Sequence, residues 1–315
     1  MTMMRRMRLT ALRASGAAVA IAAVCAMAAA PAGAEEHGHG HGRGHGHVRG
    51  TYLALGDSLA FGYSQAKFEA LAPQDPAAAF DTGYVDDFAR FLKRFEHVQV
   101  VNDGCPGETT ESMMKACAYQ EAGLPLHHPY PKESQLSNAL AYIAAHPGEV
   151  GTISIDIGAN DALGVAEVVC KLDPTCVAEH APALLAQIGA NLGSILAQLR
   201  AAAPEATIVV VGLYDPFPAL STIVTSEPMA QQLNAFTVAL NGVLAQGAAA
   251  VHAIFANPFS RFNVEGTLEA EQASLCKLTN MCNHIPPDIH PTNHGYREIA
   301  RAIEQAYLSS LSSQS

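Results

Sequence analysis

The chain has 315 residues, of which 49% are hydrophobic, and its 18 basic and 29 acidic side chains give a net charge of −11. This length suits one domain with a sizeable core. The acidic balance argues against a nucleic acid partner, because such a surface repels phosphate backbones, and any affinity for lipid must come from apolar contacts.

Residues 1–34 have the pattern of a secretory signal peptide. Four arginines come first, followed by an apolar run from Ala17 to Ala30 and the small residues Ala32-Gly33-Ala34. This is the order of a charged region, an apolar region and a cleavage site. The run is too short to span a membrane comfortably, and no later stretch reaches the roughly 18 to 20 apolar residues that a membrane helix needs. We expect cleavage after Ala34, a secreted mature chain and no stable membrane insertion.

Cys25 lies inside this apolar run and leaves a lipid-anchored form open, although Ala22-Ala23-Val24 before it is a poor lipidation site. Cleavage after Ala34 removes four arginines and no acids. It leaves 14 basic against 29 acidic side chains, a net charge near −15.

Residues 35–50 form a second region, which reads HGHGHGRGHGH over 37–47. That stretch has no apolar or β-branched residues to bury, so we expect a disordered linker. Its five histidines could bind a soft or borderline metal, and an exported metal-binding module is one alternative function. A flexible tether loses entropy for each ligand that it orders, which favours a solvated spacer.

Six cysteines follow the linker and fall into three close pairs along the chain. An even number in an oxidising compartment indicates disulfides, and the clustering favours local pairing. No pair has C-x-x-C spacing, which weakens the case for a zinc site or a thioredoxin-like redox site. The expected disulfides are Cys105–Cys117, Cys170–Cys176 and Cys276–Cys282.

Residues 51–315 alternate short apolar segments with longer helical patterns. Unbroken apolar runs indicate strands buried on both faces, and the stretch Leu184–Leu199 keeps its apolar residues on one helical face. The alternation predicts one domain, a three-layer α/β/α sandwich around a parallel sheet. The expected strands are Tyr52–Leu55, Val98–Val101, Val150–Ile157, Thr207–Leu213 and Val251–Phe255.

In open sheets of this kind, ligands bind beyond the carboxyl ends of the strands. Gly56-Asp57-Ser58 follows the first expected strand. The serine stands where a helix should begin, so free backbone N–H groups can support negative charge near its oxygen. This motif alone is weak, because Asp and Ser are ordinary N-cap residues. We expect Asp57 to be structural, as a cap or turn residue.

Two further segments reach the same edge of the sheet. A turn after the second expected strand contains Gly104 and Gly107, and glycine lets a backbone N–H approach a ligand closely. Asn160 follows the third expected strand and offers a carboxamide donor. A side-chain donor aimed at a developing oxyanion is worth about 10²–10³ in rate in comparable hydrolases.

His290 stands on a proline-flanked loop ahead of a final helix, which is expected to begin at about Asn293. It is the natural base for Ser58. Three other histidines are expected at the surface rather than in a catalytic site: His180, His284 and His294.

In this order the four segments resemble the four blocks of the SGNH (GDSL) hydrolases, named for a serine, a glycine, an asparagine and a histidine. The match spans residues 51 to about 308. The resemblance implies a flavodoxin-like fold with Ser58 as nucleophile and an oxyanion hole formed by the Ser58 N–H, the Gly107 N–H and the Asn160 side chain. Gly104 competes with Gly107, but the family's donor glycine usually precedes an acidic or small residue and a threonine, as Gly107 does.

One position departs from the family pattern. Members usually carry an aspartate three residues before the histidine, where this chain has Pro287, and Asp288 is only two residues before His290. Either Asp288 reaches the imidazole Nδ1–H, or a backbone carbonyl near Pro287 orients the ring and the enzyme works as a dyad. We favour the aspartate, since a proline-rich loop is rigid enough to hold a carboxylate at an unusual spacing.

The expected activity is that of a secreted serine esterase or lipase, which cleaves acyl esters through a Ser58 acyl-enzyme. G-x-S-x-G is absent around Ser58, which argues against the α/β-hydrolase fold.

The resemblance implies a small-molecule or lipid ester as substrate, with a short to medium acyl chain, and neither a metal nor an organic cofactor. We expect a monomer. A carbohydrate acetyl esterase is the alternative, for which Tyr63, Tyr84 and Tyr130 could offer stacking surfaces in a chain without tryptophan.

Overall fold

A computed structural model of the chain describes residues 50–70, 77–130, 133–171, 173–222 and 224–312. The expected signal peptide and the His-rich segment lie outside the described residues, so both stay predictions. Within the described ranges, no helix is long and apolar enough to cross a membrane.

Five parallel strands form the central sheet, in the order β2-β1-β3-β4-β5. The three inner strands are buried along nearly their whole length, as their unbroken apolar runs predict. This order is that of flavodoxin-like sheets, which bind ligands where the winding direction changes between β1 and β3. The strands are β1 (Gly50–Gly56), β2 (Val98–Asn102), β3 (Val150–Asp156), β4 (Thr207–Val211) and β5 (Ile254–Ala256).

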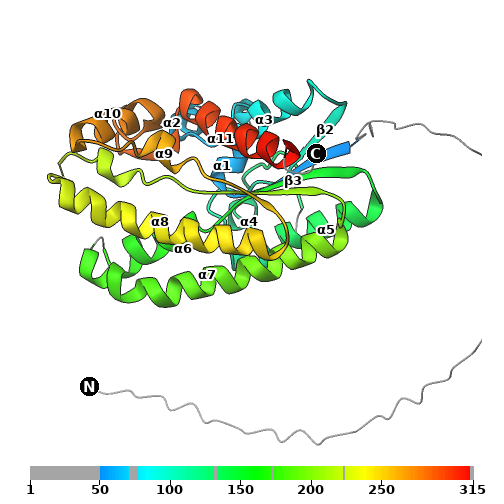
Figure 1. Cartoon of the computed structure of the whole chain (residues 1–315), viewed down its shortest axis with the longest axis horizontal. Helices are drawn as coiled ribbons and strands as arrows, with labels where there is room; N and C mark the ends of the chain where they lie inside the picture. The colour runs from blue at the N-terminus through cyan, green and yellow to red at the C-terminus, as the bar shows by residue number, and fades with distance from the viewer. Residues whose placement is uncertain (1–49, 71–76, 131–132, 172, 223, 313–315) are drawn as a thin grey trace, which may run out of the picture. The chain divides into compact units, whose positions relative to one another are not determined.

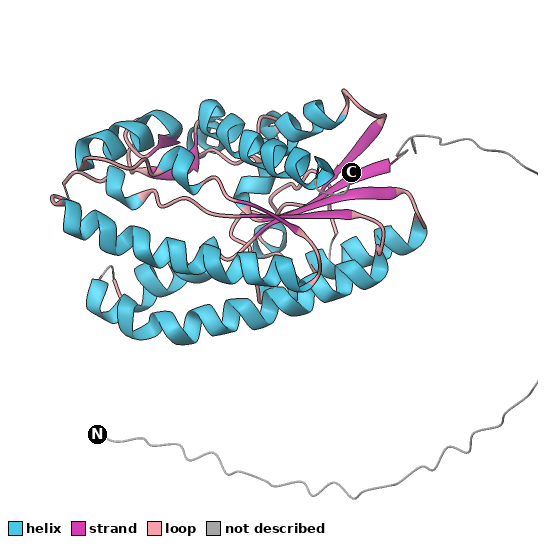
Figure 2. Ribbon diagram, viewed as in Figure 1, coloured by secondary structure: helices cyan, strands magenta, loops and turns pink. Residues whose placement is uncertain are grey.

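Helices cover both faces of the sheet, and the three-layer prediction is confirmed (Figures 1 and 2). One layer contains α3 (Tyr84–Leu92) and α11 (Asn293–Ser312); the other contains α5 (Gln135–Ala145), α7 (Pro174–Ala202) and α8 (Glu227–Ala250). The apolar face expected over Leu184–Leu199 is buried in the core. The remaining helices are α1 (Ser58–Phe61), α2 (Gln65–Ala70), α4 (Ala118–Glu121), α6 (Ala159–Leu163), α9 (Phe259–Phe262) and α10 (Leu268–Leu278).

Short elements complete the fold. β6 (Thr279–Asn280) and β7 (Asp288–Pro291) form an antiparallel pair apart from the main sheet. A π-helix, η3 (Gly164–Val169), follows α6 directly. The 3₁₀ turns are η1 (Ala77–Phe80), η2 (Ser112–Met114) and η4 (Phe217–Ala219).

The largest error in the expected strands is at β5, which begins at Ile254 rather than at Val251. Val251 still caps the end of α8, and His252 adopts a left-handed conformation with φ of 54°. The chain therefore has to turn before it can extend into the sheet.

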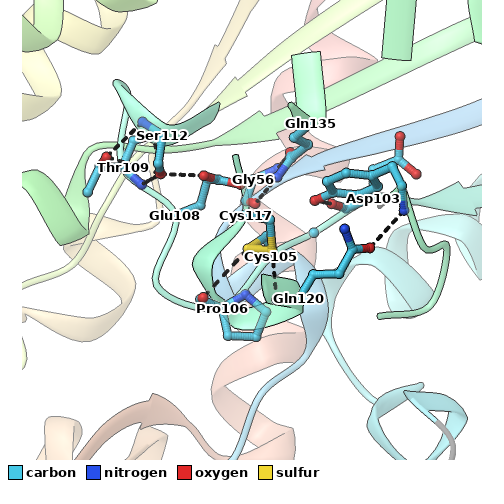
Figure 3. Close-up of a disulfide and its surroundings, with 12 residues drawn as sticks. Gly56, Asp103, Cys105, Pro106, Glu108, Thr109, Ser112, Cys117, Gln120 and Gln135 are labelled. Carbon is cyan, nitrogen blue, oxygen red and sulfur yellow. Dashed lines mark hydrogen bonds between the residues drawn. A yellow bond between two sulfur atoms is a disulfide. The ribbon is translucent and has the colours of Figure 1, made fainter. Parts of the chain in front are cut away.

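The three expected disulfides are present: Cys105–Cys117, Cys170–Cys176 and Cys276–Cys282. The first joins the turn after β2 to the cap of α4, and so closes the segment that contains Gly107. Figure 3 shows this disulfide with the residues around it.

Candidate active site

Ser58 begins α1 directly after β1, at the carboxyl edge of the sheet. β1 packs closely on β3 here, and a Cβ at Gly56 would overlap the Asp156 carboxyl, so this position requires glycine. Asp57 caps α1 as expected, because its Oδ1 accepts a hydrogen bond from Leu59 N at 2.9 Å. The turn is thus fixed from both sides of the serine.

Ser58, His290 and Asp288 lie in one chain of contacts. His290 Nε2 is 2.9 Å from Ser58 Oγ, and His290 Nδ1 is 2.5 Å from Asp288 Oδ1. Asp288 and His290 both belong to β7, and residues two apart in a strand point to the same face. The unusual spacing therefore places the carboxylate beside the ring. This is the contact expected if Asp288, rather than a backbone carbonyl near Pro287, orients His290.

Asp288 is buried and accepts two backbone hydrogen bonds as well. His290 N donates to Oδ1 at 3.1 Å, and Gln65 N donates to Oδ2 at 3.0 Å. Burial raises the pKa of this carboxyl, but the hydrogen bonds and charge of His290, with the Gln65 N–H, outweigh it and leave the pKa below its usual value. Asp288 is therefore ionised at neutral pH and can balance a positive imidazolium.

Two tyrosines hold the segment around His290. The Tyr63 ring packs against the imidazole with 4.7 Å between ring centroids, and the Tyr214 hydroxyl donates to Ile289 O at 2.6 Å. The Tyr63 carbonyl in turn accepts a hydrogen bond from the Tyr296 hydroxyl at 2.7 Å. These contacts restrict movement of the ring relative to Ser58.

The three expected oxyanion donors belong to Asn160, Ser58 and Gly107. Asn160 Nδ2 donates to Glu108 O at 2.8 Å and to Asp57 Oδ2 at 3.2 Å, which places the amide beside the serine turn. Among the described residues, neither the Ser58 N–H nor the Gly107 N–H has a hydrogen-bond partner. Both backbone donors are therefore free for a ligand.

Gly104 and Gly107 differ in their surroundings. A Cβ at Gly104 would lie 2.6 Å from Phe61 N, and its own N–H donates to Asn102 Oδ1 at 3.0 Å. Gly107 has φ of +82° and open space around its Cα. Gly104 thus lets the turn pack on α1, while Gly107 is the glycine with an available N–H.

Residues 54–298 match the model of the GDSL-like lipase/acylhydrolase family. The chain belongs to this family. It is therefore a hydrolase of the lipase and esterase type. No curated protein matches the sequence.

Solved structures show the same fold as this GDSL-like hydrolase. An extracellular lipase from Streptomyces rimosus is 20% identical, with 82% of this chain and 99% of that chain covered and a TM-score of 0.55. A phospholipase A1 from Streptomyces albidoflavus NA297 is 19% identical, with the same coverage and TM-score. A lipase from a goat rumen metagenome is 16% identical, with 82% and 97% covered and a TM-score of 0.51.

A buried carboxyl pair lies beneath the serine turn of the GDSL-like hydrolase. Asp156, at the end of β3, accepts hydrogen bonds from the Tyr84 hydroxyl at 2.5 Å and from Asp57 N at 3.2 Å. Burial and the neighbouring Asp57 carboxyl raise the pKa of Asp156 well above its usual value. In the sequence, Asp156 could have been found as an acidic residue at the end of an otherwise uncharged buried strand.

An apolar pocket of about 450 Å³ opens beside Ser58 and His290. Its walls come from α6, η3, α7, α8 and the loop after β4, with side chains that include Leu163, Leu185, Leu220, Leu233, Phe236 and Leu240. Besides Asp57, His290 and Tyr214, Asp215 is the one ionisable residue among the described lining residues. It is 2% exposed, and burial raises its pKa to about 7, so this carboxyl is mostly uncharged in mildly acidic solution.

The three histidines expected at the surface of the GDSL-like hydrolase lie at or near it. His180 is exposed, and His284 and His294 are partly exposed. The His284 ring nevertheless braces the segment before β7, with Nδ1 2.7 Å from Pro286 O and Nε2 3.0 Å from Glu69 Oε2.

The tyrosines considered for sugar stacking are buried. Tyr63, Tyr84 and Tyr130 are 9%, 0% and 3% exposed. Each hydroxyl donates a hydrogen bond within the protein, to Gln65, Asp156 and the Asp103 carbonyl. The expectation that they could stack on a carbohydrate was wrong, because their rings belong to the protein interior.

Proposed function

We propose that the chain is a serine ester hydrolase with Ser58 as nucleophile, His290 as general base and Asp288 as the ionised partner of the imidazole. The observation that carries this proposal is the pair of contacts on the two ring nitrogens, 2.9 Å to Ser58 Oγ and 2.5 Å to Asp288 Oδ1. A serine hydroxyl is a weak nucleophile unless an adjacent base takes its proton, and this geometry supports His290 as that base.

The proposed reaction has two stages. His290 takes the hydroxyl proton while Ser58 Oγ attacks the ester carbonyl carbon, and the proton then passes to the departing alcohol. The Ser58 N–H, the Gly107 N–H and the Asn160 amide would stabilise the carbonyl oxygen as it becomes negative. His290 then activates a water molecule, which releases the acyl group from Ser58. These steps use side chains, backbone donors and water, and call for no cofactor.

We also propose that the acyl chain of the substrate enters the apolar pocket between α7 and α8. The volume of about 450 Å³ is many times the ~30 Å³ that one water molecule occupies in the liquid, so the pocket has room for far more than an acetyl group. The apolar lining supports a fatty acyl ester over an acetylated sugar, since polar partners for hydroxyl groups are sparse in this wall.

Hydrolysis of p-nitrophenyl esters of increasing chain length tests the pocket. Each methylene buried in it contributes about 0.8 kcal/mol, so kcat/KM is expected to rise about fourfold per methylene from acetate to at least hexanoate. A series in which acetate is the best substrate would contradict the acyl-pocket assignment and favour a deacetylase.

A substitution in the pocket wall sharpens this experiment. Ala181 on α7 lines the pocket, so Ala181→Phe is expected to lower kcat/KM for octanoate by at least tenfold and to leave acetate hydrolysis within twofold, because a ring there takes the space of about three buried methylenes. Ala183 lies on the same helix but is exposed, so Ala183→Phe is the matched control. Equal losses on both esters, or equal effects of both variants, would count against the assignment.

We propose that the enzyme acts outside the cytoplasm. Its three disulfides support this, because such bonds persist in oxidising compartments. The arginine-rich and apolar pattern of residues 1–34 points the same way.

A further inference from the structure

Glu108 is a buried carboxyl group in the turn of Gly107. Its side chain is 1% exposed, although the glycine before it is exposed. The Ser112 hydroxyl donates to Oε1, and Gln135 Nε2 donates to Oε2 at 3.1 Å. Figure 3 shows Glu108 between Ser112 on one side and Gln135 with Gly56 on the other.

Gln135 connects this carboxyl to the serine turn. It is fully buried at the start of α5 and binds both backbone groups of Gly56, which is two residues before Ser58. Gly56 N donates to Gln135 Oε1 at 2.6 Å, and Gln135 Nε2 donates to Gly56 O at 2.9 Å. One amide group thus contacts the segments that contain Ser58 and Gly107.

The main chain of Glu108 completes the connection. Its carbonyl oxygen accepts the hydrogen bond from Asn160 Nδ2 at 2.8 Å. At the other end of the turn, Cys105 N donates to Gly56 O at 3.0 Å, and the disulfide to Cys117 holds that end in place. Glu108 therefore contacts, directly or through Gln135, the segments of all three proposed oxyanion donors.

We propose that Glu108 and Gln135 are positioning residues, which hold the Gly107 N–H and the Asn160 amide at the places where they meet the oxyanion. This inference rests on the proposed function. Oxyanion donors act in the transition state rather than on the bound ester, so loss of their positioning lowers kcat and leaves KM nearly unchanged.

The ionisation of Glu108 gives a second readout. Burial raises its pKa to about 7, and the charges of Asp57 and Asp161 act in the same direction. The hydrogen bonds from Ser112 and Gln135 lower the pKa and offset part of this rise. The ionised carboxyl accepts hydrogen bonds from both Ser112 and Gln135, whereas protonation turns one oxygen into a donor and breaks this pattern. Part of kcat is therefore lost as the pH falls through about 7.

The experiment compares variants of the full-length enzyme on one p-nitrophenyl ester. Glu108→Ala and Gln135→Ala are each expected to lower kcat about 10²-fold with KM within twofold, because a displaced donor costs that much. The double variant should lose little more than either single one, since the two residues act as a unit. Glu108→Gln replaces one acceptor by a donor, as protonation does, so its kcat should fall between those of the wild type and Glu108→Ala, and one ionisation should disappear from the acidic limb of the kcat profile.

Glu111→Ala is the matched control, because this glutamate lies in the same segment but is exposed and pairs with Lys115. It is expected to leave kcat unchanged. Wild-type kcat in Glu108→Ala, alongside an inactive Ser58→Ala, would overturn the positioning role alone; an active Ser58→Ala would overturn the proposed function itself. Should Glu108→Ala not fold, as judged by circular dichroism, the pH profile of Glu108→Gln decides, and an unchanged acidic limb would refute the inference.

Discussion

Alanine at Ser58 or at His290 is expected to lower kcat for ester hydrolysis by about 10⁶, because either change removes the activated nucleophile as a whole. Ser58→Ala leaves no oxygen to form the acyl-enzyme. His290→Ala leaves the hydroxyl without the base that lies 2.9 Å away. The measurement is steady-state turnover of a p-nitrophenyl ester with folding checked by circular dichroism.

The two changes should also be non-additive. The double variant is expected to be no slower than the worse single one, since the residual rate then comes from binding and the oxyanion donors alone. His294→Ala is the control, a partly exposed histidine in the first turn of α11, and it should keep kcat within twofold. A Ser58→Ala enzyme that keeps a tenth of wild-type activity would show that another nucleophile does the chemistry.

Asp288→Ala is expected to lower kcat by about 10⁴, as the loss of the triad acid does in a serine protease with the same catalytic arrangement. Without this carboxylate, the imidazolium lacks its counter-charge and the Nδ1–H lacks the acceptor 2.5 Å away. The pKa of Asp288 lies below its usual value because of the contacts with His290 and the Gln65 N–H, so the carboxylate is ionised and this contribution is present across the neutral range.

Asp288→Asn tests the charge separately from the contact. The amide can still accept one hydrogen bond, yet kcat should stay near the value of Asp288→Ala, because a neutral group cannot balance the imidazolium. Asp173→Ala is the control, an exposed aspartate that caps α7. A kcat within tenfold of wild type for Asp288→Ala would favour a dyad whose histidine is held by a backbone carbonyl.

Local pattern was sufficient to predict the layers of the fold. Unbroken apolar runs mark the buried inner strands, and the single apolar face over Leu184–Leu199 marks α7, because burial imposes these periods on the sequence. The start of β5 was predicted three residues too early, because Val251 caps α8 and His252 turns the chain before the strand begins. Ligands bind beyond the carboxyl ends of parallel strands, so the positions of Ser58 and Asn160 after their strands predict them as site residues from sequence alone.

The supporting contacts of the site could not be predicted in the same way. Gln135 binds Gly56 across 79 positions of the chain, and Gln65 reaches Asp288 through its backbone, which no side-chain motif records. The pocket combines residues from α6 to the catalytic loop, so its volume depends on how these elements pack. The stacking expectation for Tyr63, Tyr84 and Tyr130 failed for the same reason, because the packing of the folded chain decides which side chains are exposed.

Covalent labelling of the wild-type enzyme with a fluorophosphonate tests the central claim most directly, because an activated serine attacks phosphorus much as it attacks an acyl carbon. Peptide mapping by mass spectrometry is expected to place the adduct on Ser58, with labelling abolished in Ser58→Ala and strongly slowed in His290→Ala. An adduct on another residue, or no adduct on an enzyme that hydrolyses esters, would contradict the assignment of Ser58 as the nucleophile and His290 as its base.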